Sequence, residues 1–439
     1  MKWFKNIMFG LLMLMLALPL IQRTTPIFRE TPLQGYFSTP KKPSITKDSV
    51  FDGTFQEAYN NYFEHTIGFR PTLVRINNQM AFSVFDTALA NGVIIGKKNY
   101  LYEINYIKAY KGWDYQGDSM IEDRTRKAAF VHQQLAEAGK TLLFIFAPGK
   151  ATFFPEYIPE KYMQRPSGEK TNHQAFIEKF DKYGLPYIDF NSWFVQMKDT
   201  ASFPLYPQCG IHWSAYGVAL ATDSLIHYIE NERGIDMVDF GWNGFDLPDT
   251  LRKPDYDIAD GMNLLFKIPH YPMAYPRTVF SSYDGKVRPN AIVVADSYYW
   301  NIFGKGYSSR LFSDNNFWYY NKEVHNPAWP APRKTGEMDM LEELSKADVI
   351  IIMATEANLY RFPYGFIDRA YETLNKNRQQ AGSLLSFSQK ETEIQNIMKS
   401  IDVNPEWKAK VAQKALDRKI SYEEMLKLDA TWIWESKQK

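Results

Sequence analysis

Short, uninterrupted runs of apolar residues are the feature that most constrains the fold of this chain. The runs are TLLFIFA (141–147), NAIVVAD (290–296) and ADVIIIMAT (347–355), and each is bounded by polar or turn-forming residues. Runs of this length that are rich in β-branched residues are typical of parallel strands buried on both faces. The chain is therefore expected to contain a sheet with helices packed against both sides.

Helical segments alternate with these runs. One predicted helix near 124–138 ends at Gly139 just before the first run, and another near 172–183 ends at Gly184 before LPYIDF. A third pattern, GVALATDSLIHYIENERG, repeats its apolar residues at helical spacing. Strands that alternate with helices predict a three-layer α/β domain with a parallel sheet over roughly 85–365.

The segments on either side of this rhythm differ in composition. Residues 23–50 are rich in Pro, Thr, Ser and Lys and are expected to form a linker. The domain is expected to span 51–384 and a helical tail 385–439. Capping signals support the tail helices, namely Asn404 followed by Pro405, and Ser421 followed three residues later by Glu424.

The first 22 residues combine a short basic start, MKWFKN, with the uncharged apolar run IMFGLLMLMLALPLI (7–21). A run of about 15 residues is shorter than the roughly 20 that a full membrane span needs, and it resembles the apolar part of a signal sequence. No clear small-x-small cleavage site follows. We favour a retained signal anchor in the cytoplasmic membrane, with the N-terminus inside and the bulk on the extracytoplasmic (periplasmic) side. Cleavage and release is the second interpretation, and a buried helix of a cytosolic protein is the third.

Charge, histidine spacing and cysteine content limit the classes of partner and cofactor that the chain is expected to bind. The chain has 51 basic and 50 acidic residues, a net charge of +1 and no concentrated basic run, which argues against nucleic acid as a main partner. The seven histidines and the single cysteine show no metal-ligand spacing. No phosphate-binding glycine motif follows a strand. We therefore expect neither a metal nor another cofactor.

Reactive groups in parallel α/β sheets lie in the loops at the carboxyl ends of the strands. The run VVAD leads into Ser297, whose hydroxyl is expected near free backbone N–H groups at the start of a helix. Asp296 is expected to hold that turn, and either residue could equally be a helix cap. His212 lies in the loop YPQCGIHWSAYG just before a helix and could act as a general base towards Ser297.

Two further features of these loops could contribute to a site. Glu356 and Asn358 follow the 347–355 run, either as helix caps or as walls of the same cleft, with Asn358 as a polar contact for substrate. Cys209 precedes His212 by three residues, but a small buried side chain is the simpler interpretation. Trp213 follows His212 and looks exposed in the sequence, and Tyr298 follows Ser297. Both are candidates for supporting the site or binding substrate.

The ordered set of motifs resembles the SGNH-hydrolase-like family of the alginate O-acetyltransferase type, the DHHW-like proteins. The matching pieces are FEHTIGFR, NGVIIGKKNYLYE, FIFAPGKATFFPEYIP, GIHWSAYG, VVADSYY and TEANL, over about 51–365. The resemblance implies an O-acetyltransferase or acetylesterase that acts on a cell-surface polysaccharide through a serine acyl-enzyme. It also implies a membrane-bound acyl-transfer protein as partner, with Ser297 as nucleophile and His212 as general base.

One departure from the family pattern concerns the acid that orients the histidine. The family aspartate would fall two residues before His212, where this chain has Gly210. Loss of such a carboxylate costs about 10⁴ in rate in serine proteases. Asp257, Asp260 and Glu356 are candidate replacements, and the sequence does not rank them. The alternative is a catalytically degenerate protein that binds glycan or scaffolds an acetylation or export complex.

Overall fold

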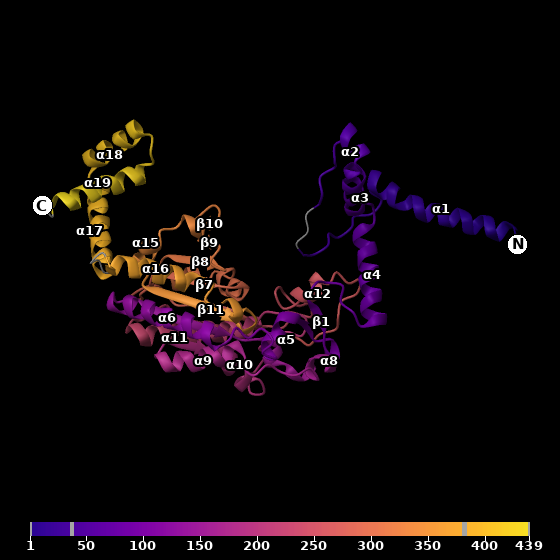
Figure 1. The fold of residues 1–439 in the computed structure, drawn as a ribbon, viewed down its shortest axis with the longest axis horizontal. Coiled ribbons are helices and arrows are strands. Elements are labelled where there is room, and N and C mark those ends of the chain that lie inside the picture. Colours follow the sequence, from indigo (N-terminus) through magenta and orange to yellow (C-terminus); the bar gives the residue numbers. More distant parts are fainter. Residues whose placement is uncertain (1, 36–38, 380–383, 438–439) are drawn as a thin grey trace.

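The computed structural model describes residues 2–35, 39–379 and 384–437 of the chain (Figure 1). Its centre is a seven-stranded sheet in the order β10-β9-β8-β7-β11-β3-β4. The strands span β3 Thr141–Ala147, β4 Tyr187–Asp189, β7 Ala291–Ala295, β8 Asn315–Tyr319, β9 Glu323–His325, β10 Arg333–Lys334 and β11 Val349–Thr355. Strands β8, β7, β11, β3 and β4 run parallel, whereas β9 and β10 add an antiparallel edge. The predicted parallel α/β sheet is confirmed.

Helices cover both faces of this sheet and make it a three-layer structure. One face packs against α5 Ile104–Tyr110, α7 Lys150–Phe153, α10 Phe190–Met197 and α11 Ala215–Arg233. The other packs against α6 Asp118–Glu137, α9 Asn172–Tyr183, α15 Met340–Lys346 and α16 Phe366–Gln379. Alternate residues of β3 point to opposite faces, with Leu143 and Ile145 in the first core and Leu142 and Phe144 in the second. This alternation explains why the strand is apolar at every position.

Shorter elements surround the sheet. Two antiparallel hairpins are β1 Val93–Ile95 with β2 Leu101–Glu103, and β5 Phe240–Asp246 with β6 Tyr275–Phe280. The short α-helices are α8 Glu160–Met163, α12 Asp257–Gly261, α13 Trp300–Phe303 and α14 Tyr307–Leu311. The 3₁₀ segments are η1 Lys97–Asn99, η2 Pro155–Tyr157, η3 Ser297–Tyr299, η4 Thr335–Glu337 and η5 Glu356–Arg361. Strands β5, β6, β8, β9 and β10 were not predicted from the sequence.

The N-terminal part of the chain contains α1 Lys2–Thr24, α2 Lys47–Phe51, α3 Thr54–Thr66 and α4 Arg70–Phe85. Helix α1 is continuous over 22 apolar-rich residues from Trp3 to Thr24, so by length and composition it could cross a membrane. The 15-residue apolar run therefore understated the length of the helix. The apolar stretch of α1 is not buried against the rest of the protein, whereas a core helix of a cytosolic protein would be.

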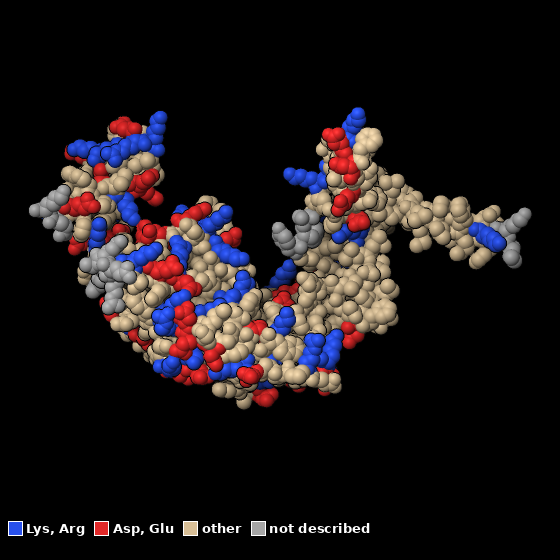
Figure 2. All heavy atoms as spheres, in the orientation of Figure 1, with Lys and Arg blue, Asp and Glu red and all other residues tan. Residues whose placement is uncertain are grey.

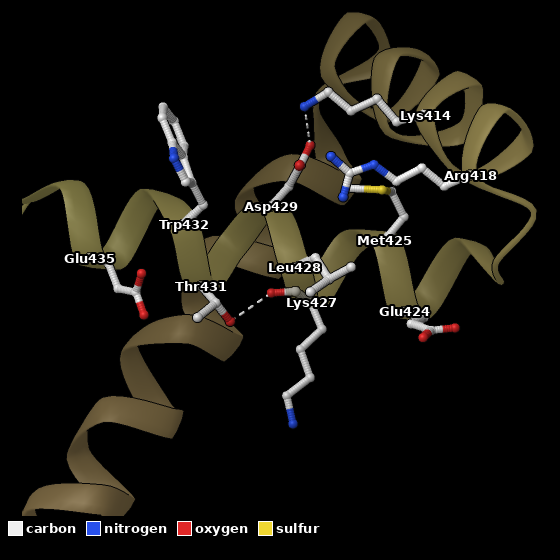
Figure 3. Close-up of a pocket in the computed structure, with 10 residues that line it drawn as sticks. All are labelled: Lys414, Arg418, Glu424, Met425, Lys427, Leu428, Asp429, Thr431, Trp432 and Glu435. Atoms are coloured by element: carbon white, nitrogen blue, oxygen red, sulfur yellow. Dashed lines mark hydrogen bonds and ion pairs between the residues drawn. The ribbon is translucent and has the colours of Figure 1, made fainter.

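The C-terminal region is helical, as expected, and comprises α17 Leu384–Val403, α18 Pro405–Arg418 and α19 Tyr422–Lys437. Asn404 caps α18 by accepting the Trp407 N–H, and the Ser421 hydroxyl accepts the Glu424 N–H. These helices have a small apolar core of their own and stand at the opposite end of the molecule from α1 (Figure 1). A cavity of about 660 Å³ lies on this unit. Figure 3 shows its lining residues, among which Lys414 pairs with Asp429 near Trp432.

Candidate active site

The candidate site lies where two central strands end. The turn after β7 carries Ser297, and its neighbour Asp296 fixes that turn with both carboxylate oxygens. Asp296 Oδ1 accepts the Tyr298 N–H at 3.1 Å, and Oδ2 accepts the Thr355 N–H at 2.8 Å and the Asn358 side-chain amide at 2.9 Å. Asp296 therefore ties the turn after β7 to the end of β11, which is the turn-holding position expected from the sequence.

Ser297 and His212 lie within hydrogen-bonding distance, although 85 residues separate them in the sequence. The distance from Ser297 Oγ to His212 Nε2 is 3.0 Å. His212 Nδ1 lies 2.6 Å from Oδ2 of Asp257, the first residue of α12. An ionised carboxylate only accepts hydrogen bonds, so Nδ1 carries the proton and Nε2 of the neutral ring is free to accept from the serine hydroxyl. The three side chains form one hydrogen-bonded line.

The second oxygen of Asp257 fixes the geometry of this line. Asp257 Oδ1 accepts the backbone N–H groups of Ile211 at 2.9 Å and Ile258 at 2.8 Å. Because Ile211 directly precedes His212, the carboxylate holds both the ring and the backbone beside it. The side chains of His212 and Asp257 are 15% and 27% exposed, so the pair is largely shielded but still accessible from outside.

The glycine at position 210 follows from the same packing. A Cβ on Gly210 would lie 2.7 Å from the carbonyl oxygen of Pro254 and 2.9 Å from that of Asp255. The segment that delivers Asp257 thus occupies the space that an aspartate side chain at 210 would need. The acid beside the histidine comes from a different segment of the chain, and the two arrangements exclude each other.

Two buried side chains hold the loops of Ser297 and His212 together. The hydroxyl of Tyr298 donates to the Ile211 carbonyl, so the residue after the serine bonds the residue before the histidine. The ammonium of Lys150 donates to the carbonyls of Gln208 at 2.8 Å and Gly210 at 2.5 Å. Lys150 was not predicted from the sequence, although it lies in the segment FIFAPGKATFFPEYIP just after β3.

The surroundings of His212 favour the protonated imidazolium more than water does. Burial by itself lowers the pKa of this imidazole, but the hydrogen bond and charge of Asp257 outweigh burial and raise the pKa above its ordinary value. The carboxylates of Asp296 and Glu103 add to the rise. A histidine of this kind accepts a proton readily and then remains stabilised as imidazolium.

The structure places Glu356, Asp260 and Asn358 away from direct contact with His212. Glu356 is buried and accepts a hydrogen bond from the Thr152 hydroxyl beside Gly149. Asp260 lies one turn beyond Asp257 and lines a separate cavity of about 750 Å³ next to the N-terminal segment. The side-chain amide of Asn358 is engaged by Asp296. Among the three candidate acids, only Asp257 contacts the histidine in the described part of the chain.

Trp213, Tyr298 and Cys209 are buried. Trp213, which looked exposed in the sequence, is fully buried and packs against the rings of Phe190 and Tyr298. Trp213 and Tyr298 therefore support the loops from within, and neither offers a surface to a ligand. Burial raises the pKa of the Cys209 thiol to about 11, so the sulfur stays protonated and unreactive at neutral pH.

With the geometry established, the comparison with protein families is decisive for the fold. Residues 93–239 match the family described as the SGNH hydrolase-like domain of the acetyltransferase AlgX. This part of the chain is similar to that family, and the α/β fold around it is SGNH-hydrolase-like. The matched residues include Lys150 and His212, whereas Asp257 and Ser297 lie beyond them. No curated protein matches the sequence.

Solved structures of the same kind are similar at low sequence identity. The O-acetyltransferase domain of Pseudomonas putida AlgJ is 16% identical, with 64% of this chain and 99% of that chain covered and a TM-score of 0.41. Pseudomonas aeruginosa AlgX is 12% identical, with 63% and 67% covered and a TM-score of 0.39. Bacillus cereus PatB1 is 12% identical, with 57% and 93% covered and a TM-score of 0.36.

Proposed function

We propose that this chain is a membrane-anchored, extracytoplasmic O-acetyltransferase that acetylates hydroxyl groups of a cell-surface polysaccharide through an acetyl-Ser297 intermediate. The observation that carries the proposal is the unbroken line of hydrogen bonds from Ser297 through His212 to Asp257. The acetyltransferase description of the matching family indicates the group transferred. Helix α1 is long and apolar enough to cross a membrane, which supports the proposed anchoring in the cell envelope.

In the first half-reaction, Ser297 Oγ attacks the acetyl carbonyl of the donor while His212 Nε2 takes the hydroxyl proton. The Asp257 carboxylate stabilises the imidazolium that forms, and the backbone N–H of Ser297 at the start of η3 faces the developing oxyanion. Collapse of the tetrahedral intermediate expels the donor's leaving group, which receives the proton from His212. The product is an acetyl ester on Ser297, for which we propose a membrane-bound acyl-transfer protein as donor.

In the second half-reaction, a sugar hydroxyl replaces the donor. His212 Nε2 removes its proton, the sugar oxygen attacks the acetyl carbonyl, and Ser297 leaves as an alkoxide that recovers the proton. Water would give hydrolysis by the same steps, so transfer requires that the acceptor reaches the ester before water does. The degenerate, non-catalytic alternative depended on the missing acid at Gly210, and Asp257 supplies a carboxylate at the required nitrogen.

The test uses the full-length protein in detergent with p-nitrophenyl acetate. We expect a burst of nitrophenol and an acetyl adduct on the Ser297 peptide by mass spectrometry. Ser297→Ala should lose both, whereas Ser282→Ala, which removes an exposed serine hydroxyl, should keep both. An unchanged burst in Ser297→Ala would contradict the acyl-enzyme. Faster loss of the adduct when an oligosaccharide is added, with acetylated sugar as product, would distinguish transfer from hydrolysis.

A further inference from the structure

Helix α4 presents an apolar stripe that no part of the described chain covers. Leu73, Ile76, Met80 and Val84 recur at helical spacing and are 50%, 48%, 53% and 68% exposed. Their neighbours Asn77 and Ser83 are exposed and uncharged. A helix in a water-soluble protein normally turns such a stripe towards the core. A contiguous exposed stripe of this kind marks an interaction surface.

The opposite side of α4 is fixed to the body of the protein. The Asn78 side chain donates to the Met262 carbonyl, and Gln79 accepts the N–H of Phe266, both in the segment that follows α12. Arg75 donates to the carbonyls of Thr31 and Pro32 in the N-terminal segment. The polar side of α4 is therefore used internally, and the apolar stripe points away from the body.

Helix α1 leaves the body beside α4. In Figure 1, α4 runs along the side of the body from which α1 extends outwards, and α12 lies on the other side of α4. Because α4 contacts the α12 segment, its stripe points towards the space into which α1 extends. Figure 2 shows that this side of the body, below α1, is largely free of charged side chains. The stripe and α1 thus face the same environment.

The junction between α1 and the helices that follow is tightly packed. A Cβ on Gly68 would collide with the Pro19 carbonyl, so only glycine allows the two backbones to approach this closely. The Arg23 guanidinium lies over the rings of Tyr62 and Phe63 at 5.3 and 5.6 Å. Tyrosine is enriched where a spanning helix meets the lipid headgroups, and an arginine near the end of such a helix extends its side chain to that level. The junction therefore has the composition of a membrane boundary and fixes the direction of α1 relative to α4.

We infer that α4 lies along the membrane surface, with the stripe of Leu73, Ile76, Met80 and Val84 inserted at the level of the lipid headgroups and upper acyl chains. The ligand is a phospholipid bilayer. Helix α4 contains no acidic residue, so nothing on it is repelled by anionic headgroups. The inference rests on the anchoring by α1 that is part of the proposed function. A protein partner on the same stripe is the alternative that the experiment separates.

This arrangement gives the candidate site a fixed place relative to the membrane. The segment bonded by Asn78 and Gln79 follows directly on α12, whose first residue is Asp257. A bilayer contact at α4 therefore restrains the same piece of chain that orients His212. An enzyme that takes its acetyl group from a membrane-embedded donor benefits from such a restraint, because the reactive serine stays at one height above the bilayer.

The experiment measures lipid contact in the full-length chain. In a Cys209→Ala background, single cysteines at Met80→Cys and Val84→Cys are labelled with an environment-sensitive fluorophore. The protein is reconstituted into vesicles of phosphatidylcholine and phosphatidylglycerol that contain doxyl-labelled lipid. Leu12→Cys on α1 reports the anchor, and Gln413→Cys on the exposed side of α18 reports the background. We expect strong quenching at 12, 80 and 84 and little at 413.

The outcomes separate this inference from the proposed function. Quenching at 12 together with background quenching at 80 and 84 would overturn the surface contact and leave anchoring intact; it is the result expected if a protein covers the stripe. Background quenching at 12 would overturn both the anchoring by α1 and the surface contact of α4 that rests on it. A second variant, Leu73→Ser with Ile76→Ser, should reduce quenching at 84 but not at 12. The acetyl-enzyme burst measured in detergent is independent of these readings.

Discussion

Two histidine–aspartate pairs lie at the carboxyl edge of the same sheet and differ in what the histidine meets next. His212 bonds Asp257 through Nδ1 and meets Ser297 through Nε2. His173 bonds Asp189 at the end of β4, with 3.0 Å between Nε2 and Oδ1, and its ring packs edge-on against Phe146. Burial alone would lower the pKa of each histidine. In both pairs the hydrogen bond and charge of the carboxylate outweigh burial, so the pKa of the histidine is raised.

The comparison shows that a raised histidine pKa does not by itself identify a site. Asp189 also accepts the Ser192 N–H as the cap of α10, so this pair closes a helix end. Asp257 instead holds the backbone before a histidine whose second nitrogen faces a serine hydroxyl. The two pairs differ because the histidine of only one of them also meets a serine hydroxyl. The substitutions below test whether this contact distinguishes a reactive pair from a structural one.

The largest effect is expected for Asp257→Asn. Loss of the carboxylate removes the stabilisation of the imidazolium, and by analogy with serine proteases kcat/KM should fall about 10³- to 10⁴-fold. Burial of His212 is then opposed only by the charges of Asp296 and Glu103, so its pKa falls and the acidic limb of the kcat/KM profile moves to lower pH. Asp260→Asn, one turn further along α12, should keep both rate and profile. Equal losses in the two variants would show that Asp257 has no special role.

An aspartate introduced at position 210, where the family pattern has one, should not act as the orienting acid. Gly210→Asp places a side chain against the carbonyls of Pro254 and Asp255, and the strain should reduce stability by about 1–3 kcal/mol. In the Asp257→Asn background it should not recover activity, because the segment of residue 257 occupies the required space. Thermal unfolding and the ester assay measure the two parts. Recovered activity in the double variant would mean that either residue can supply the acid.

A smaller loss is expected when Lys150 is replaced by Met. Two hydrogen bonds to the His212 loop disappear, and a shift of that loop should lower kcat about 10- to 100-fold with little change in KM. Lys140→Met is the matched control, since Lys140 is also buried and donates to two backbone carbonyls, those of Ser345 and Ala347, but before β3 rather than after it. Both variants should lose stability, and only Lys150→Met should lose activity.

Lys150 also gives a pH signature of stability. Burial lowers its pKa to about 7, whereas an unfolded lysine keeps its proton to much higher pH. Between these values the unfolded chain binds more protons, so the free energy of unfolding should rise with pH above about 7. Lys150→Met should remove this part of the rise. Denaturant titrations at pH 7 and pH 9 measure it, and an unchanged slope would contradict the assignment.

The sequence predicted the parts of the site that depend on local pattern. Strand β3 spans the predicted run 141–147, and the strand-end rule led to Ser297 and His212. Asp257 could not be ranked above Asp260 or Glu356, because its contact with His212 depends on how an irregular segment packs against Gly210. Strand β8 was missed for a related reason, since NNFWY begins with two asparagines and lacks the uninterrupted apolar pattern.

The smallest effect on catalysis is expected in the second pair. His173→Leu leaves Ser297, His212 and Asp257 untouched, so kcat/KM should stay close to that of the unmodified protein. Stability should fall by about 1–3 kcal/mol, because the Asp189 carboxylate loses a charge-assisted hydrogen bond. The folded pKa of His173 is raised, so this contribution is complete below its unfolded pKa and disappears as pH rises through the folded value. The gap in melting temperature should therefore be wider at pH 6 than at pH 9. A loss of activity as large as that of Asp257→Asn would instead make the second pair part of the reaction path and remove the distinction drawn between them.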